Sequence, residues 1–377
     1  MQENPKSWSS RVPQLDGLRG IAVGLVVLFH YGADEIPAIR SIASRGWVGV
    51  DLFFVLSGFL IGGIVIANKE ADNLFSVFYL RRFLRIFPLY YLLLGTVAML
   101  MWADWMPRSE HRGLFFYFVY LQNIIGFLTG YPGDPGPVWL QPTWSLAIEE
   151  QFYLILPALV VLTPSRLLKR VLVIGILIPI SMRIIGFLIP VEDPRDFALF
   201  FSLCRCDALF YGVLLAWMVH NGHTSISIKT RIVCCYAGAA ALLLGFLATY
   251  RYDSLVFTVG LSLLGPLFFC VVALSIMHEH GPVAQITKIK LLRWVGIRTY
   301  AIYLFHMPAL SSVSALFKLI GVNPHGLTRP LALTLTLVCA AASWHLIEAP
   351  LIGLGHKLKY GRGAKPLVLT LDEFPAR

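Results

Sequence analysis

Long apolar segments alternate with short polar stretches along the whole chain. Eleven such segments lie near residues 18–33, 47–67, 86–104, 114–130, 146–162, 171–190, 206–220, 232–249, 255–277, 295–317 and 331–352. A helix needs about 20 mostly apolar residues to cross a bilayer, with a range of roughly 17 to 25. The first segment is short for that task, and the fourth is interrupted by Gln122 and Asn123. The pattern predicts an all-α, polytopic membrane helix bundle.

The positions of Lys and Arg indicate which segments cross. If the N-terminus is cytoplasmic and segment 114–130 does not cross, the inner segments hold 20 of the 31 Lys and Arg residues and the outer loops hold nine. If segment 114–130 crosses, the inner count falls to 12 and the outer count rises to 17. Cytoplasmic loops carry the excess of positive charge in membrane proteins. We therefore expect ten spans, both termini in the cytoplasm, and segment 114–130 lying on or dipping into the outer face.

The composition is typical of a multi-pass protein, which we assign to the cell (inner) membrane. Hydrophobic residues make up 57% of the chain and charged residues 14%, against roughly 25% charged residues in soluble domains. We divide the chain into one integral membrane domain, residues 1–355, and a short basic cytoplasmic tail, residues 356–377. The net charge of +10 fits loops that face anionic lipid rather than nucleic acid. The six cysteines form no paired CxxC motifs, so we expect no metal site.

The first apolar segment carries two ionisable residues on nearly one helix face. Arg19 and His30 are eleven residues apart, which is close to three helical turns and about 16 Å along the axis. An ionisable group inside a span is costly and marks a functional site by default. The expected topology places Arg19 at the cytoplasmic mouth and His30 toward the outer half of the membrane.

A second group of cations lies at another cytoplasmic span end. Arg82 and Arg85 are three residues apart and share a helix face. Anchoring by the positive-inside rule explains such a pair without any ligand. Guanidinium groups also bind phosphate well. Together with Arg19, the pair would suit a phosphorylated carrier such as coenzyme A, whose long thioester arm could reach down to His30.

Carboxylates occur in two of the apolar segments. Asp51 precedes Gly58-x-x-x-Gly62, a sequence typical of close helix packing in lipid. Asp51 either reaches the interface or pairs with a buried cation such as His30. Glu149 and Glu150 enter the fifth segment side by side, about 100° apart on a helix. Placing even one carboxylate in lipid is costly, so at least one should face an interior cavity.

Other polar residues lie at or within the later segments. Ser145 is a possible helix cap, and Arg205 stands at an outer span end. His306 lies inside a span, where a lone histidine is either a satisfied structural group or a catalytic one. His345 and Glu348 are three residues apart, so we expect them to share a helix face and to form a local hydrogen bond.

These motifs together resemble the signatures of acyltransferase family 3. The matching stretches are Arg19-x10-His30, Val50–Ile61, Arg82-x-x-Arg85, Thr143–Tyr153, Tyr303–His306 and Ile347-Glu348-x-Pro350. They follow one another over nearly the whole chain. The family consists of integral membrane proteins with a ten-span core that transfer acyl groups, usually acetyl, to surface saccharides and related acceptors. Some members carry an additional extracytoplasmic esterase-like domain, and we expect this chain to act without one.

The resemblance implies a transferase that moves an acyl group, most often acetyl, from cytoplasmic acetyl-CoA or another acyl-CoA to a carbohydrate hydroxyl. The acceptor classes it implies are exopolysaccharide, lipopolysaccharide and lipo-oligosaccharide. His30 would act as general base or as an acyl-carrying nucleophile. The implied site residues are His30, Asp51 and Glu149 for catalysis, Arg19, Arg82 and Arg85 for the donor, and Ser145, Glu150, Arg205, His306 and Glu348 for the acceptor or for support.

A membrane transporter of a polar or lipid-linked saccharide is the rival interpretation. Intramembrane charges and ten spans suit that class as well. The sequence shows neither an inverted repeat nor a pair of broken helices, which favours the acyltransferase. We expect the outer loops near residues 131–140 and 191–205 to shape the acceptor site.

Overall fold

The computed structural model describes residues 12–32, 37–106, 113–124, 137–189, 193–222, 227–250, 255–322 and 326–363. These residues form helices and loops, with no β-strand among them. Nine helical stretches in this part of the chain are long and apolar enough to cross a membrane. They confirm the all-α, polytopic fold that the apolar pattern predicts.

Four of the nine stretches combine a short helical turn with one or two longer helices. The nine are α1 (Pro13–Gly32), η1 (Gly46–Val48) with α3 (Gly49–Ala67), α4 (Leu74–Trp102), η3 (Gln141–Thr143) with α7 (Trp144–Leu162), α8 (Ser165–Leu188), α12 (Ile228–Thr249), η4 (Val256–Gly260) with α14 (Leu261–Met277), α17 (Thr299–Leu319), and α18 (Thr328–Ser343) continued by η5 (Trp344–Glu348) and α19 (Ala349–Lys357).

Two of the predicted segments differ from a full-length span. Segment 206–220 is α11 (Asp207–Asn221), which has only 15 residues. Helix α11 packs on α3, α8 and α14, so other helices rather than lipid cover much of its surface. Its length therefore need not match the thickness of the hydrocarbon core. Segment 114–130 begins with α5 (Leu114–Phe118), five residues long. Residues 114–124 therefore form no spanning helix, as expected, and residues 125–130 lie outside the described part.

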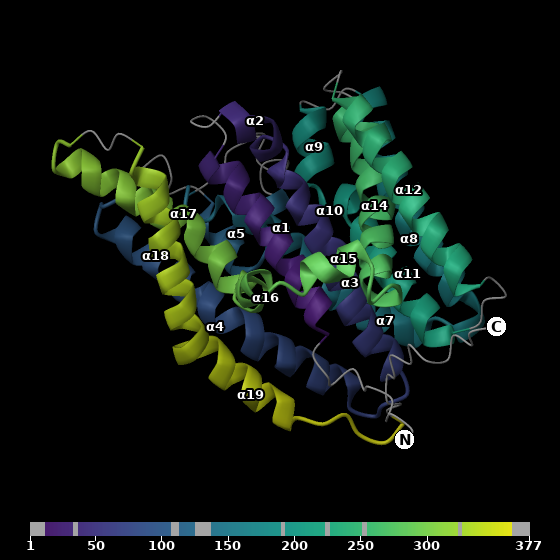
Figure 1. The fold of residues 1–377 in the computed structure, drawn as a ribbon. Coiled ribbons are helices and arrows are strands. Elements are labelled where there is room, and N and C mark those ends of the chain that lie inside the picture. Colours follow the sequence, from purple (N-terminus) through teal and green to yellow (C-terminus); the bar gives the residue numbers. More distant parts are fainter. Residues whose placement is uncertain are drawn as a thin grey trace.

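Helix α3 occupies the interior of the bundle (Figure 1). In its most apolar stretch 78% of the residues are buried inside the protein, against 11% for the peripheral helix α12. Glycines allow α3 and α11 to approach closely. A Cβ atom on Gly58 would lie 2.0 Å from the Leu209 carbonyl oxygen, and one on Gly212 would lie 2.2 Å from the Val55 carbonyl oxygen. The helix-packing role predicted for the Gly58 motif is confirmed.

The two ends of the bundle carry different short helices (Figure 1). We call them the α9 end, which holds α2 (Pro37–Ala43) and α9 (Pro194–Phe200), and the α19 end, which holds α19. Helix α1 packs along α15 (Pro282–Thr287) and α16 (Lys290–Ile297) and contacts α2 with its last residues. The sequence analysis predicts that the α19 end faces the cytoplasm.

Candidate active site

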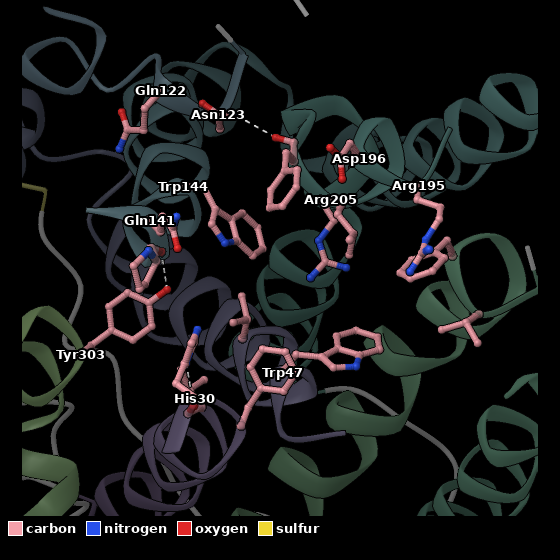
Figure 2. Close-up of a pocket in the computed structure, with 18 of the residues that line it drawn as sticks. His30, Trp47, Gln122, Asn123, Gln141, Trp144, Arg195, Asp196, Arg205 and Tyr303 are labelled. Carbon is pink, nitrogen blue, oxygen red and sulfur yellow. Dashed lines mark hydrogen bonds between the residues drawn. The ribbon is translucent and has the colours of Figure 1, made fainter. Parts of the chain in front are cut away.

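A partly open cavity of about 670 Å³ lies at the α9 end. This volume falls within the roughly 300–1,000 Å³ range of small-molecule sites. Its polar and charged lining residues are His30, Ser44, Gln122, Asn123, Gln141, Arg195, Asp196, Arg205 and the hydroxyl-bearing Tyr117, Tyr250 and Tyr303 (Figure 2). Part of the predicted outer loop 191–205 therefore lines the cavity, while residues 131–136 lie outside the described chain.

His30 stands on the cavity wall near the last turn of α1. Its Nδ1 lies 2.9 Å from the carbonyl oxygen of Val26, one turn earlier. A carbonyl only accepts, so Nδ1 carries the hydrogen and Nε2 keeps its lone pair. The ring extends toward the cavity (Figure 2). The local geometry of α1 thus prepares His30 to accept a proton at Nε2.

His306 lies directly against His30, although the two residues are far apart in sequence. The two imidazole centroids are 4.9 Å apart. His306 is completely buried, its Nδ1 donates to the Tyr303 carbonyl at 2.7 Å, and its Nε2 is buried without a hydrogen-bond partner in the described structure. His306 is therefore a buried histidine with one ring nitrogen hydrogen-bonded, in contact with the ring of His30.

Tyr303 connects this pair to the start of α7. Its hydroxyl donates to the Pro142 carbonyl at 2.5 Å and lies 2.7 Å from the Ser145 hydroxyl. Ser145 thereby holds Tyr303, which lines the cavity, rather than capping α7 with its side chain. The sequence analysis did not propose Tyr303 as a site residue. Its position three residues before His306, on the same helix face, was the available signal.

Asp51 and Arg205 form a buried ion pair at the cavity. The Arg205 Nη2 atom lies 3.0 Å from Asp51 Oδ1 and 3.1 Å from Oδ2, and both residues are 2% exposed. Asp51 therefore pairs with a buried cation, one of the two interpretations of the sequence, but the cation is Arg205 instead of His30. Arg205 is buried rather than standing at an outer entrance, and it still lines the cavity.

The predicted donor arginines gather at the α19 end. Arg82, Arg85 and the neighbouring Arg81 line a second hollow of about 120 Å³ together with His356 and Tyr360. This volume is smaller than the roughly 300–1,000 Å³ of pockets that enclose a whole ligand, so the hollow suits a terminal group such as a phosphate. Arg81 was not proposed from the sequence, although it directly precedes the Arg82 motif.

Arg85 is the most accessible cation of this group. Its side chain is exposed, yet it lies within electrostatic range of Arg19 on α1, Tyr153 on α7 and Glu348 on η5. Arg85 therefore lies among charged and polar residues of several helices. Arg19 is ion-paired with Asp16 at 3.3 Å. The structure brings the three predicted arginines to one end of the bundle and places His30 at the cavity toward the other end.

The two adjacent glutamates lie between these regions. Glu149 is near Ser57, Arg82, Arg85 and Tyr303, and Glu150 is near Arg82. The Arg82 guanidinium also stacks over the Tyr153 ring at 4.1 Å. Both glutamates therefore lie close to residues of other helices, and the expectation that at least one of them faces an interior cavity stays a prediction. Neither occurs among the residues that line the His30 cavity.

The predicted hydrogen bond between His345 and Glu348 is wrong. Glu348 is 4% exposed and accepts a hydrogen bond from the Ser343 hydroxyl at 3.0 Å, while His345 is exposed. Residues Trp344–Glu348 form a π-helical turn. A π-helix joins residues five apart, so it aligns Ser343 with Glu348 and turns His345 away. Glu348 instead lies near Arg85 and Arg298, beside the arginine group.

Among the described residues that line the cavity, Asp196 carries the one carboxylate. It lies on α9, outside the membrane-spanning helices, next to Arg195. Partial burial and the nearby Asp193 raise the pKa of the Asp196 carboxyl, and Arg195 opposes this shift. The Arg195 guanidinium stacks over the Phe257 ring at 4.9 Å. The cavity rim thus combines a cation, an anion and an aromatic face.

Comparison with known proteins gives a family match over most of the chain. A family model described as an acyltransferase domain matches residues 12–347. Similar curated proteins include peptidoglycan O-acetyltransferase OatA of Listeria monocytogenes, which is 30% identical over 376 residues and covers 94% of this chain. Putative peptidoglycan O-acetyltransferase YrhL of Bacillus subtilis is 30% identical and putative O-acetyltransferase SACOL0978 of Staphylococcus aureus is 27% identical, each over 357 residues and 90% of this chain.

The similarity covers only part of these relatives. The matched region spans 58% of OatA, 57% of SACOL0978 and 55% of YrhL, so this chain corresponds to little more than half of their length. No solved structure matches the chain significantly.

Proposed function

This chain belongs to acyltransferase family 3, and on that premise we propose that it is an integral membrane O-acetyltransferase with a carbohydrate acceptor. Family membership favours the acyltransferase over the transporter that the sequence left as a rival. The names of the similar proteins favour acetyl as the transferred group and a glycan as the acceptor. Acetyl-CoA is the proposed donor.

We place the acceptor in the 670 Å³ cavity, where His30 is the general base. Its Nε2 would take the proton from a sugar hydroxyl as the hydroxyl oxygen attacks the thioester carbonyl. The carbon–sulfur bond then breaks, and the thiolate of coenzyme A leaves and takes up a proton. The observation that carries this proposal is the hydrogen bond from Nδ1 to Val26, because it leaves the lone pair of Nε2 for the reaction.

The donor would approach from the α19 end. Arg82 and Arg85 would hold phosphate oxygens there, because both line the small hollow at this end. The pantetheine arm would then cross the region of Glu149 toward His30. The roughly 16 Å between Arg19 and His30 along α1 is the distance that this arm has to cover. A long flexible carrier suits such a separation better than a small activated acyl group.

Thioester turnover tests the proposal. Purified protein in lipid nanodiscs receives acetyl-CoA with and without soluble glycan fragments, and free thiol and acetylated product are both measured. We expect thiol release that depends on acceptor and matches the acetylated sugar mole for mole. Absence of both products with every glycan tested, from folded protein, would contradict the proposed function.

A further inference from the structure

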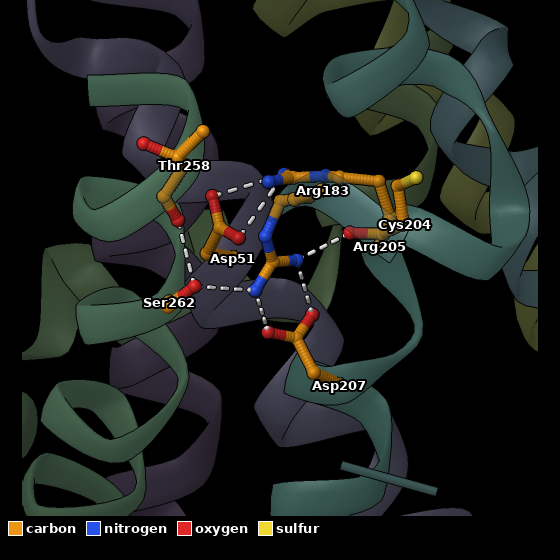
Figure 3. A network of polar contacts seen from close by, with 7 residues as sticks. All are labelled: Asp51, Arg183, Cys204, Arg205, Asp207, Thr258 and Ser262. Atoms are coloured by element: carbon orange, nitrogen blue, oxygen red, sulfur yellow. Dashed lines mark hydrogen bonds and ion pairs between the residues drawn. The ribbon is translucent and has the colours of Figure 1, made fainter. Parts of the chain in front are cut away.

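Two buried arginine–carboxylate pairs lie side by side in the bundle (Figure 3). Only one of them reaches the cavity. Arg205 pairs with Asp51, and Arg183 pairs with Asp207 at 2.6 and 3.1 Å. Arg183 also donates to Ser262 at 2.9 Å and to the Cys204 carbonyl. Arg205 lines the 670 Å³ cavity, whereas Arg183 does not.

The Arg205 guanidinium is incompletely used inside the protein. Asp51 takes both of its bonds from Nη2 alone, and Nε is buried without a hydrogen-bond partner among the described residues. Phe54 and Trp144 lie within 5.6 and 5.8 Å of the guanidinium carbon. A guanidinium carries five N–H donors in one plane. Figure 2 shows this group pointing into the cavity beside Trp144.

Among the described residues, each arginine that lines the cavity lies close to a carboxylate. Arg195 is near Asp196, which also lines the cavity, and Arg205 is paired with Asp51. Arg45 stacks over the lining residue Tyr250 at 4.5 Å but does not line the cavity itself. A carboxylate on a ligand would lose its hydration here without gaining an uncompensated cation, and such burial is costly. Neutral hydroxyl and carbonyl oxygens can instead accept from the Nη1 group of Arg205, because Nε is buried and Nη2 donates to Asp51.

The remaining lining favours flat, uncharged rings. Trp47 and Trp144 contribute indole rings. Phe257 and Tyr250 also line the cavity, and a guanidinium group lies over each of these two rings. Pyranose rings present C–H groups on their faces and hydroxyls at their edges. Aromatic walls with a few oriented polar groups match that distribution.

We propose that the Arg205–Asp51 pair makes this cavity a subsite for an uncharged saccharide unit and excludes acidic sugars. Arg205 binds oxygen atoms of the acceptor, and Asp51 acts through Arg205 by cancelling its charge. This inference rests on the proposed function, because it assumes that the cavity holds the acceptor. It adds a substrate class and a specificity-determining pair to that function.

Binding without donor tests the inference separately from catalysis. Methyl cellobioside and methyl chitobioside are compared with the same disaccharides oxidised to a terminal uronic acid, using thermophoresis of the protein in nanodiscs. Wild type should bind at least one neutral sugar about tenfold or more tightly than its acidic counterpart. In Asp51→Asn, the charge of Arg205 is no longer compensated. The ratio of neutral to acidic affinities should therefore fall by about tenfold.

The second ion pair, between Arg183 and Asp207, supplies a matched control. Asp207→Asn also leaves a buried arginine uncompensated, so it should lower the melting temperature to a similar extent. It should leave the ratio of neutral to acidic affinities unchanged, because Arg183 does not line the cavity. If Asp51→Asn does not fold, the double variant Asp51→Asn/Arg205→Gln removes both charges. It should keep the preference for neutral sugar while weakening the binding of both members of each pair.

Three results would overturn the inference. Wild type could bind acidic and neutral sugars equally, it could bind none of the disaccharides, or folded Asp51→Asn could keep the wild-type ratio. None of these depends on acetyl transfer. Loss of thioester turnover with intact binding preference would instead contradict the proposed function and leave the subsite standing.

Discussion

At the scale of single residues, the candidate chemistry depends on the hydrogen bond that Nδ1 of His30 makes. Val26 fixes Nδ1 of His30, and the cavity receives the side of the ring that carries Nε2. His306 packs against it with a ring-centroid distance of 4.9 Å, and its own Nε2 has no partner among the described residues. Both histidines bond Nδ1 to a carbonyl of their own helix, so the position of His30 on the cavity wall distinguishes the candidate base from the fully buried His306.

Replacing His30 should remove the base without disturbing the fold. We expect His30→Ala to lower kcat for acetyl transfer by about 10²- to 10⁴-fold, the usual contribution of general base catalysis. Product formation and thiol release measure this loss. His345→Ala is the control, because His345 is an exposed histidine in another span. A His30→Ala protein with wild-type turnover would exclude the histidine from the mechanism.

Arg82 should act on donor binding rather than on chemistry. Charge-assisted hydrogen bonds contribute about 1.5–3 kcal/mol, so Arg82→Ala should raise the KM for acetyl-CoA by about 10- to 100-fold with little change in kcat. Initial rates over a range of acetyl-CoA concentrations measure both constants. Arg170→Ala, which changes an exposed arginine on α8, should leave KM unaltered. An unchanged KM in Arg82→Ala would contradict phosphate binding.

At the scale of elements, glycines fix how α1 crosses α16. A Cβ atom on Gly20 would lie 2.1 Å from the Leu292 carbonyl oxygen, and one on Gly296 would lie 1.7 Å from the Asp16 carbonyl oxygen. These contacts join backbone to backbone, so no side-chain rotation can relieve a substitution. The crossing lies beside Arg19 and therefore sets the position of that cation relative to the α19 end.

A side chain at this crossing should separate the two helices. We expect Gly20→Leu to destabilise the protein by about 1–3 kcal/mol through overpacking, which a lower melting temperature would show. Gly24→Leu tests the same change one turn further along α1, where no atom lies within 4 Å of the added Cβ. Equal melting temperatures for the two variants would contradict the close crossing.

At the scale of the whole molecule, the bundle has two chemically different ends. The α9 end holds the large cavity with aromatic walls, and the α19 end holds the cluster of arginines. The asymmetry suits a reaction in which donor and acceptor arrive from opposite sides. The excess of Lys and Arg predicts that the α19 end is cytoplasmic.

Cysteine labelling can establish this orientation. The exposed Arg166 lies in the first turn of α8 and reports on the adjoining connection between α7 and α8. In a Cys234→Ala background, Arg166→Cys should react only from the cytoplasmic side. Arg40→Cys on α2 should react only from the outer side, because α2 lies at the opposite end. Labelling of Arg166→Cys solely from outside would reverse the topology.

The sequence alone determined the helices and most candidate residues. Lipid offers the backbone no hydrogen-bond partners, so apolar segments of sufficient length must be helices, and intramembrane polar residues such as His30 and Asp51 stand out against them. The packing role of Gly58 could also be predicted from the sequence, because it depends on a local spacing. The sequence did not predict the short length of α11 or the π-helical turn that ends at Glu348, since packing against other helices decides both.

Only the tertiary structure decided which polar residues meet. Asp51 pairs with Arg205, 154 residues away, and His30 meets His306 from another helix. Periodicity tells which face of a helix a residue occupies, but it does not tell which other helix covers that face. Each buried charge needs a partner of opposite charge, and the sequence contains several residues that could be that partner. The arrangement of the bundle selects one, and with it the cavity in which His30 and Arg205 lie.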